Sequence, residues 1–160
     1  LRRTKQDVLD ELPDKIENNI KISFSKEEEN LYIANLSQIN DKLKSALDIE
    51  QIDKFQILSM MTRLRQLCCE PRILYNDIQE PSSKMKACLD IIKKAKENKQ
   101  KVLLFSSFTS SLEFIEKELR KDDISYYVLT GATNKIKRHQ LVNAFQNDNT
   151  NVFLKSTIYG

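Results

Sequence analysis

The sequence predicts an α/β protein in which a helical segment precedes a parallel sheet. Three observations predict it: the apolar spacing changes midway along the chain, the second half repeats strand-length and helix-length units, and the composition is balanced. Of the 160 residues, 40% are hydrophobic and 31% are charged, which is ordinary for a globular chain with a real core. The formal net charge of +3 neither requires nor excludes a nucleic-acid partner, because an even total can hide a basic face.

The first half of the chain has helical spacing. Pro13 ends any helix before it, and residues 16–24 alternate enough to form a short strand or an extended connector. Residues 25–28 read Ser-Lys-Glu-Glu, a capping box in which serine and glutamate satisfy free helix-start amides. Two stretches, the second ending before Pro71, then repeat apolar residues every three to four positions: Tyr32, Leu36, Ile39, Leu43 and Leu47, then Phe55, Leu58, Met61, Leu64 and Leu67. Two consecutive helices with facing stripes predict a helical hairpin.

A boundary is predicted at residues 76–83, which hold a proline and several polar groups. Ser82 or Ser83 is expected to cap the next helix. The inner face of that helix is expected to carry Met85, Leu89 and Ile92. Residues 101–105 then form a short apolar run behind one lysine, which is typical of a strand buried on both faces.

Alternating units complete the second half. Residues 110–113 form a second capping box that opens a helix, residues 126–129 form the next strand, and Thr133 or Asn134 begins another helix. After a turn, residues 152–154 form a third strand. The side chains predicted to point inward from the two helices are Leu112, Ile115 and Leu119, then Leu141, Val142 and Phe145. Strand, helix, strand, helix, strand at this spacing predicts parallel pairing with right-handed crossovers.

Several classes of site are disfavoured by composition. With only Gly131 and Gly160, neither G-x-x-x-x-G-K-[ST] nor G-x-G-x-x-G can be written. A zinc site needs about four ligands, and His139 is the only histidine. The three cysteines are best interpreted as small apolar residues on helices in a reducing compartment: Cys68, Cys69 and Cys88. No apolar run approaches the ~20 residues of a membrane helix, and no catalytic triad is assembled.

Two loops follow predicted strands and carry hydroxyl groups. Residues 106–109 read Ser-Ser-Phe-Thr, and residues 130–133 read Thr-Gly-Ala-Thr. In parallel α/β sheets ligands gather at the carboxyl ends of the strands, and hydroxyls beside free helix-start amides suit phosphate oxygens. Ser and Thr also cap helices without binding anything, so both interpretations stay open. Arg138 follows the second loop by about one and a half helical turns, whereas most basic runs are solvated faces.

Six segments in order resemble the SWI/SNF-type ATPases, a helicase-like family of DNA-dependent ATPases. The segments are residues 1–8 with 11–15 ("LRR-x-K-x-x-V … LP-x-K"), 64–71 ("LRQ-[LI]-C … P"), 82–84 ("SSK"), 101–109 (helicase motif IV), 127–133 with Arg138 and Phe145 ("Y-x-x-L-x-G-x-T … R … F"), and 152–154 (the start of motif V). One departure stands out: the family continues motif V as "S-L-K-A-G-G", and Ile158 occupies the lysine position here. Because the chain begins with Leu1, it is expected to start inside a longer polypeptide.

The resemblance implies a partial RecA-like (P-loop NTPase-type) lobe preceded by a helical insertion. Residues 1–24 would be a connector from the first motor lobe, 25–75 a helical protrusion, and 76–160 the truncated start of the second lobe. The residues implied to contact the DNA backbone are Ser107, Thr109, Gly131, Thr133 and, more weakly, Arg138. No catalytic residue and no metal ligand is implied within this chain.

The resemblance also implies partners for the parent protein. These are double-stranded DNA, the first motor lobe of the same chain, and possible protein partners at the helical protrusion, with no membrane. ATP and Mg would serve the parent, and none is expected on the isolated segment, which would not hydrolyse ATP alone. The location would be cytoplasmic, associated with the nucleoid in a bacterium, or nuclear in a eukaryote. Two alternatives stay open: a helical protein-interaction module on an α/β support, and a small-ligand-binding α/β domain.

Overall fold

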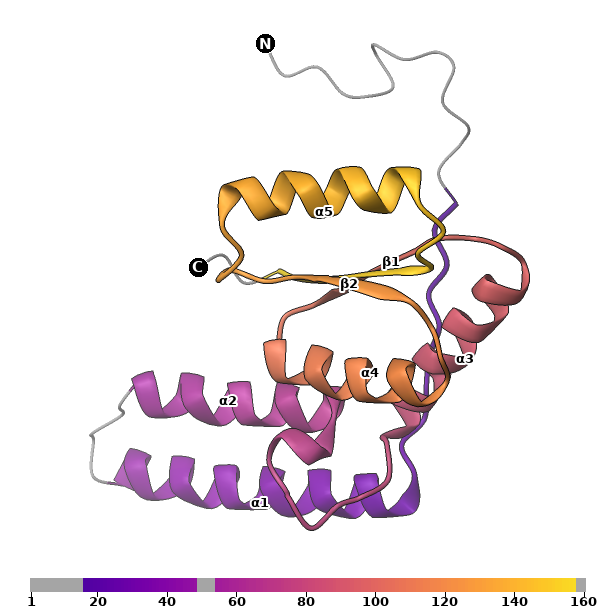
Figure 1. The fold of residues 1–160 in the computed structure, drawn as a ribbon. Helices are drawn as coiled ribbons and strands as arrows, with labels where there is room; N and C mark the ends of the chain where they lie inside the picture. Colours follow the sequence, from indigo (N-terminus) through magenta and orange to yellow (C-terminus); the bar gives the residue numbers. More distant parts are fainter. Residues whose placement is uncertain (1–15, 49–53, 158–160) are drawn as a thin grey trace.

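The computed structural model describes residues 16–48 and 54–157. The helical half contains α1 (Lys26–Asp48), α2 (Lys54–Cys69) and a 3-10 turn, η2 (Pro71–Ile73). The second half contains α3 (Ser83–Glu97), β1 (Val102–Ser106), α4 (Thr109–Lys121), β2 (Tyr126–Leu129), α5 (Lys135–Asn147) and β3 (Val152–Ser156). Figure 1 shows α5 on one face of the sheet and α4 on the other, with the α1–α2 hairpin beyond α4. The predicted α/β architecture, helices first and sheet second, is confirmed.

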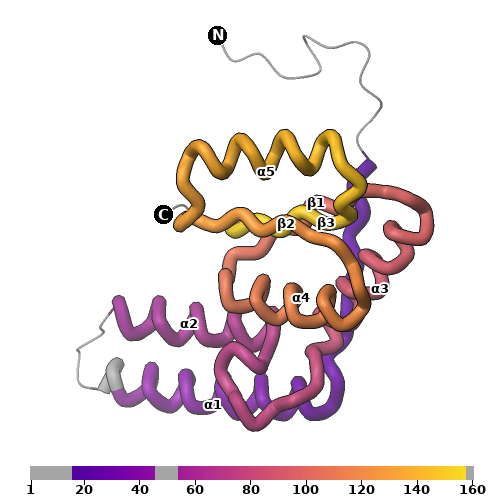
Figure 2. The backbone as a smooth tube through the Cα atoms, viewed as in Figure 1, coloured from indigo at the N-terminus to yellow at the C-terminus, as the bar shows by residue number. Residues whose placement is uncertain are grey.

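The sheet consists of three parallel strands in the order β1-β3-β2. β3 lies in the middle, and both its neighbours run parallel to it. Figure 2 shows the backbone of the three strands in one layer between α5 and α4. One apolar cluster joins α3, α4 and the face of the sheet beneath them, and includes Ile92, Leu119 and Leu154. A second cluster, Leu129, Phe145 and Phe153, joins α5 to the other face. The parallel pairing predicted from the spacing of the units is therefore confirmed.

The prediction that β1 is buried on both faces is wrong. Leu103 and Phe105 remain 60% and 56% exposed. β1 lies at an edge of the sheet, whereas the cluster under α5 is built from β2, β3 and α5. Only the alternate residues of β1, Val102 and Leu104, pack against the cluster on the α4 side. A single apolar run cannot reveal which strand occupies an edge.

The helical half forms the predicted hairpin, but fewer of its apolar side chains are buried than the sequence predicts. The capping box is formed, because Glu28 N donates to Ser25 Oγ at 3.2 Å while Ser25 N donates to Glu28 Oε2 at 2.7 Å. α1 and α2 contact each other. Leu67 is buried, yet Leu58 is 64% exposed and Met61 54% exposed, so the predicted stripe on α2 faces the core only near its end. Residues 16–24 are extended without strand pairing, which selects the connector over the strand.

The helix starts in the second half differ in how they are capped. Ser82 Oγ accepts from Met85 N at 3.0 Å, and Asn134 caps α5, each one of the two candidates predicted. The capping box predicted at residues 110–113 is wrong: α4 begins at Thr109, after Phe108, with no side-chain cap. On α5, Phe145 is buried as predicted but Val142 is 42% exposed, because only the Phe145 side packs on the sheet.

A buried ion-pair network fastens the helical half to the sheet half. Arg72 Nε lies 2.9 Å from Glu70 Oε1, and Arg72 Nη1 lies 3.3 Å from Glu118 Oε1 on α4. The Arg72 guanidinium also lies 4.6 Å from the centroid of the Phe114 ring. Glu70 is fully buried and accepts from the backbone N–H of Ser82 at the start of α3. Buried charges persist only when they are paired in this way.

The three cysteines occupy helices, as predicted, and none forms a disulfide. Burial raises the pKa of the Cys68 and Cys88 thiols, so both are protonated at neutral pH. Among the described helices, none is long and apolar enough to cross a membrane.

Candidate nucleic-acid interface

The loop between β1 and α4 is held by its own hydroxyl groups. Ser106 Oγ lies 2.6 Å from Ser111 Oγ and accepts from Phe108 N at 3.1 Å. Ser111 Oγ, which is buried, donates to Phe108 O at 2.8 Å. These two hydroxyls are therefore committed to shaping the loop. Ser107 and Ser110, both half-buried, and Thr109, exposed, are the other hydroxyls at the start of α4.

The loop between β2 and α5 is a closed turn. Thr133 Oγ1 accepts from Thr130 N at 3.1 Å, and Thr133 N donates to Thr130 O at 3.1 Å. Gly131 is exposed and does not adopt a positive φ, so the backbone conformation alone does not demand glycine there. The missing Cβ instead leaves room for another molecule to approach the backbone closely.

The sheet brings these two loops to one edge. Because β1 and β2 both pair in parallel with β3, their carboxyl ends flank the end of β3. Neighbouring strands lie about 4.8 Å apart, which separates the loops by roughly 10 Å across β3. Thr157, the residue after β3, closes the gap on one side: its N–H donates to Ser106 O at 2.9 Å and its Oγ1 donates to Ser107 Oγ at 3.3 Å. Thr157 was not predicted from the sequence.

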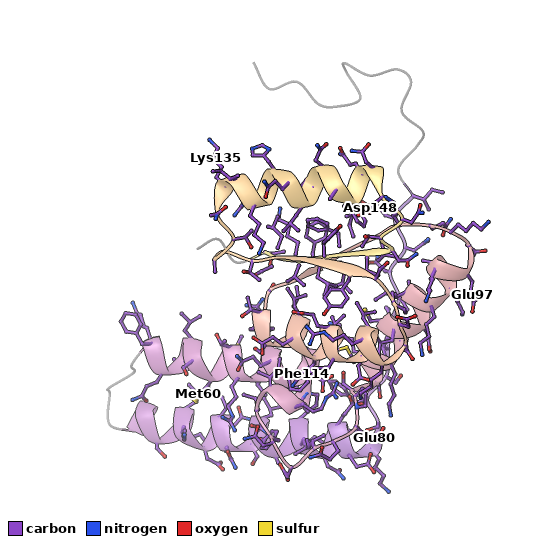
Figure 3. All side chains as sticks on the ribbon, viewed as in Figure 1. Met60, Glu80, Glu97, Phe114, Lys135 and Asp148 are labelled. Carbon is purple, nitrogen blue, oxygen red and sulfur yellow. The ribbon has the colours of Figure 1, made fainter. Side chains whose placement is uncertain are left out.

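The first turns of α5 add positive charge beside this edge. Lys135, Lys137 and Arg138 are exposed, and Figure 3 shows Lys135 at the end of α5 opposite Asp148. Within the part of the chain that the structure describes, no carboxylate lies within ion-pair distance of these three cations. Helix starts favour acidic residues, so this cluster forgoes a favourable interaction with the helix dipole. Arg138 is exposed in the first turns of α5, which follows the β2–α5 loop.

An aromatic–arginine contact joins the β1–α4 loop to the helical half. The Arg65 guanidinium carbon, on α2, lies 5.7 Å from the centroid of the Phe108 ring. Both residues line a cavity of about 710 Å³, together with Ser107 and Lys84. The sequence placed Arg65 on a helix but gave no sign of this contact, because more than forty positions separate the two residues.

The arrangement can therefore bind an extended anion. Hydroxyl groups and helix-start amides at the edge can donate hydrogen bonds to phosphate oxygens. The nearby cations add a sequence-independent attraction. No nucleophile–base pair for covalent chemistry is found among the described residues of the two loops.

Two protein-family models match the chain. Residues 1–73 match the SNF2-related domain, and residues 83–160 match the helicase conserved C-terminal domain. Together the two matches cover the whole chain except residues 74–82. Their order along the chain is the order of the motifs found in the sequence.

Similar proteins from other organisms agree with the two family models. An uncharacterized ATP-dependent helicase of Mycoplasma pneumoniae is 32% identical over 147 residues, which cover 92% of this chain and 14% of that protein. The SWI/SNF-related matrix-associated actin-dependent regulator of chromatin subfamily A member 1 of Mus musculus is 30% identical, covering 96% of this chain and 16% of that protein. The chain thus spans about one seventh of the length of these relatives.

A solved structure confirms the fold. The Sulfolobus solfataricus SWI2/SNF2 ATPase core in complex with dsDNA superposes with a TM-score of 0.79 at 25% identity, covering 100% of this chain and 36% of that one. The likeness bears out the expected RecA-like lobe with a helical segment before it. The family models, the relatives and the fold all agree, and the chain belongs to the SWI/SNF family of helicase-like proteins.

Proposed function

We propose that this chain supplies the DNA-backbone-binding edge of the second motor lobe of an ATP-dependent DNA translocase. One observation carries the proposal: two hydroxyl-bearing loops flank the end of β3 at the carboxyl edge of a parallel sheet, beside the exposed cations of α5. The named relatives are ATP-dependent helicases and chromatin regulators, and the similar archaeal core was solved with dsDNA. These names support duplex DNA as the partner.

In this proposal Ser107, Thr109 and Thr133 donate to phosphate oxygens, and Gly131 lets the backbone approach. Arg138 adds attraction from the side. Such contacts fix the position of the strand without reading its sequence, which suits a motor that moves along any DNA. Lobe closure around ATP would then shift the strand that this edge holds.

The proposal assigns three roles along the chain. Residues 1–24 connect from the first motor lobe, 25–75 form a helical protrusion, and 76–160 form the opening part of the second lobe. ATP and Mg would be bound by the parent protein, as the family resemblance implies, since this sequence has no glycine-rich phosphate loop. We expect no ATP hydrolysis by this chain alone. The parent would act on the nucleoid of a bacterium or in the nucleus of a eukaryote.

Duplex binding by the chain tests the proposal. A fluorescein-labelled duplex is titrated at several salt concentrations and followed by anisotropy. Thr109→Ala should weaken binding by about three- to tenfold, since a typical hydrogen bond contributes roughly 0.5–1.5 kcal/mol net. Ser45→Ala, which removes an exposed α1 hydroxyl bonded to Asp41 O, is the matched control and should change nothing. Salt-independent binding, or equal loss in both variants, would refute the proposal.

Thr133 calls for a different substitution. Because its Oγ1 caps the amide of Thr130, Thr133→Ala would disturb the loop as well as any DNA contact. Thr133→Ser keeps the hydroxyl, and we expect it to bind DNA within about twofold of the wild type.

A protein partner at the helical half is a second candidate function. Leu58 and Met61 are mostly exposed on α2, as is Ile33 on α1. Isolated exposed apolar residues are ordinary, but neighbouring ones mark contact surfaces. Leu58→Glu should leave DNA affinity unchanged and abolish association with such a partner, which co-purification from the native host would measure.

A further inference from the structure

One arginine outside the two loops lies beside the proposed DNA-binding edge. Arg65 belongs to α2 in the helical half, and its guanidinium lies over the ring of Phe108 at 5.7 Å. Phe108 sits between Ser107 and Thr109 in the β1–α4 loop. The helical half therefore places a positive charge against the loop that is proposed to hold the DNA backbone.

The charged residues that line the cavity at Arg65 are both cations. Arg65 and Lys84 are exposed and line the 710 Å³ cavity beside Ser107. None of the residues that line this cavity is a carboxylate. Among the described residues, neither cation has a carboxylate within ion-pair distance. The positive charge at this opening is thus left without internal compensation.

The stacking prepares Arg65 for phosphate. A guanidinium that lies over an aromatic ring interacts through its face. Its N–H edge stays free to bind a phosphate in two-pronged geometry, and the ring reduces the rotamer freedom that binding would cost. Lysine offers neither the planar edge nor the same stacking.

We propose that Arg65 is a further DNA-backbone contact, and that Phe108 is the positioning residue that holds it beside Ser107 and Thr109. The inference rests on the proposed function. It extends the DNA-binding surface from the sheet edge onto α2. The helical segment then takes part in holding DNA.

A matched control lies two residues earlier on the same helix. Arg63 is also exposed, and its guanidinium also lies 5.7 Å from an aromatic ring, that of Tyr75. Its Nε donates to Asn35 Oδ1 at 3.3 Å, so Arg63 faces α1 and the segment after α2. Arg63→Gln and Arg65→Gln change the net charge equally. Only Arg65→Gln removes a positive charge that lies beside the β1–α4 loop.

The test is duplex binding by anisotropy across a salt series, using the wild type, Arg65→Gln, Arg63→Gln and Arg65→Lys. We expect Arg65→Gln to weaken binding by roughly five- to tenfold at low salt and to lower the slope of log K against log salt by about 0.9, the value for one phosphate contact. Arg63→Gln should stay within about twofold of the wild type. Arg65→Lys should fall between, because it keeps the charge but loses the planar edge.

The outcomes separate the two proposals. Equal weakening by Arg63→Gln and Arg65→Gln would mean that only net charge matters, which overturns the role of Arg65. An unchanged Arg65→Gln beside a weakened Thr109→Ala would overturn this inference and leave the proposed function standing. Absence of duplex binding by the wild type would overturn both. Circular dichroism checks folding, and if Arg65→Gln unfolds, Arg65→Lys decides: binding equal to the wild type would refute the positioning by Phe108.

Discussion

Removing Arg72 should destabilise the protein more than any surface substitution. Arg72→Met keeps much of the apolar stem but removes the guanidinium from between Glu70 and Glu118. Glu70 is fully buried, so its charge loses its main compensation. Removing one partner of a buried ion pair costs roughly 3–5 kcal/mol, and loss of the contact with Phe114 adds about 0.5–1 kcal/mol. Such a loss is a large share of the free energy of unfolding of a typical domain, which is roughly 5–15 kcal/mol.

Urea denaturation followed by circular dichroism measures this loss. With an m-value of about 2 kcal/mol/M, a loss of about 4 kcal/mol lowers the midpoint by about 2 M. The double variant Arg72→Met/Glu70→Gln should recover part of the loss. Its glutamine removes the uncompensated charge, and its single carbonyl oxygen keeps an acceptor for one of the two amides, those of residue 72 and Ser82, that donate to the two carboxylate oxygens of Glu70. A midpoint shift below about 0.5 M for Arg72→Met, or no recovery in the double variant, would refute the reasoning.

Three further outcomes are expected. Leu119→Ala, at a fully buried position, should cost roughly 2–5 kcal/mol of unfolding free energy, whereas Leu58→Ala should cost under about 0.5 kcal/mol; equal urea midpoints would contradict the burial pattern. Glu28→Ala should cost about 1–2 kcal/mol, since Glu28 accepts from Ser25 N and from both Ser83 N and Ser83 Oγ, and Glu27→Ala serves as the control. Burial alone would raise the pKa of Glu118, but hydrogen bonds from Lys121 and Arg72 outweigh it and lower the pKa. The stability from this group is therefore present above its unfolded pKa near 4.3 and lost as the pH falls through its lower folded pKa. Urea midpoints of Glu118→Gln should accordingly fall less steeply than those of the wild type below about pH 4.5.

The elements and their order were predictable because their signals are local. The capping box at Ser25, the spacing on α3 and the alternating units after residue 101 depend on neighbours a few residues apart. The edge position of β1 was not predictable, since it depends on which strands pair with β3. The predicted cap of α4 was wrong for a related reason. Ser111 is buried, and its hydroxyl forms hydrogen bonds with Phe108 O and Ser106 Oγ. A capping pattern in the sequence does not show these bonds.

The candidate site likewise contains residues that were predictable from the sequence and residues that were not. The two loops after β1 and β2 were predictable because parallel strands end at a common edge. Thr157 was not, because its bonds to Ser106 and Ser107 follow from the register of β1 with β3. Arg65 is a long-range contact with no sequence pattern of its own. Side chains that reach the site from a distant helix need the fold before they can be recognised.

The most direct test of the DNA-binding edge is a titration of the ¹⁵N-labelled chain with a short DNA duplex, followed by amide chemical-shift changes. The largest changes are predicted at residues 106–109 and 130–133, with smaller ones along the start of α5, and all should fade as salt is raised. Changes concentrated at the opposite edge of the sheet, near residues 123–125 and 148–151, or no changes at all, would contradict the assignment of this edge to DNA.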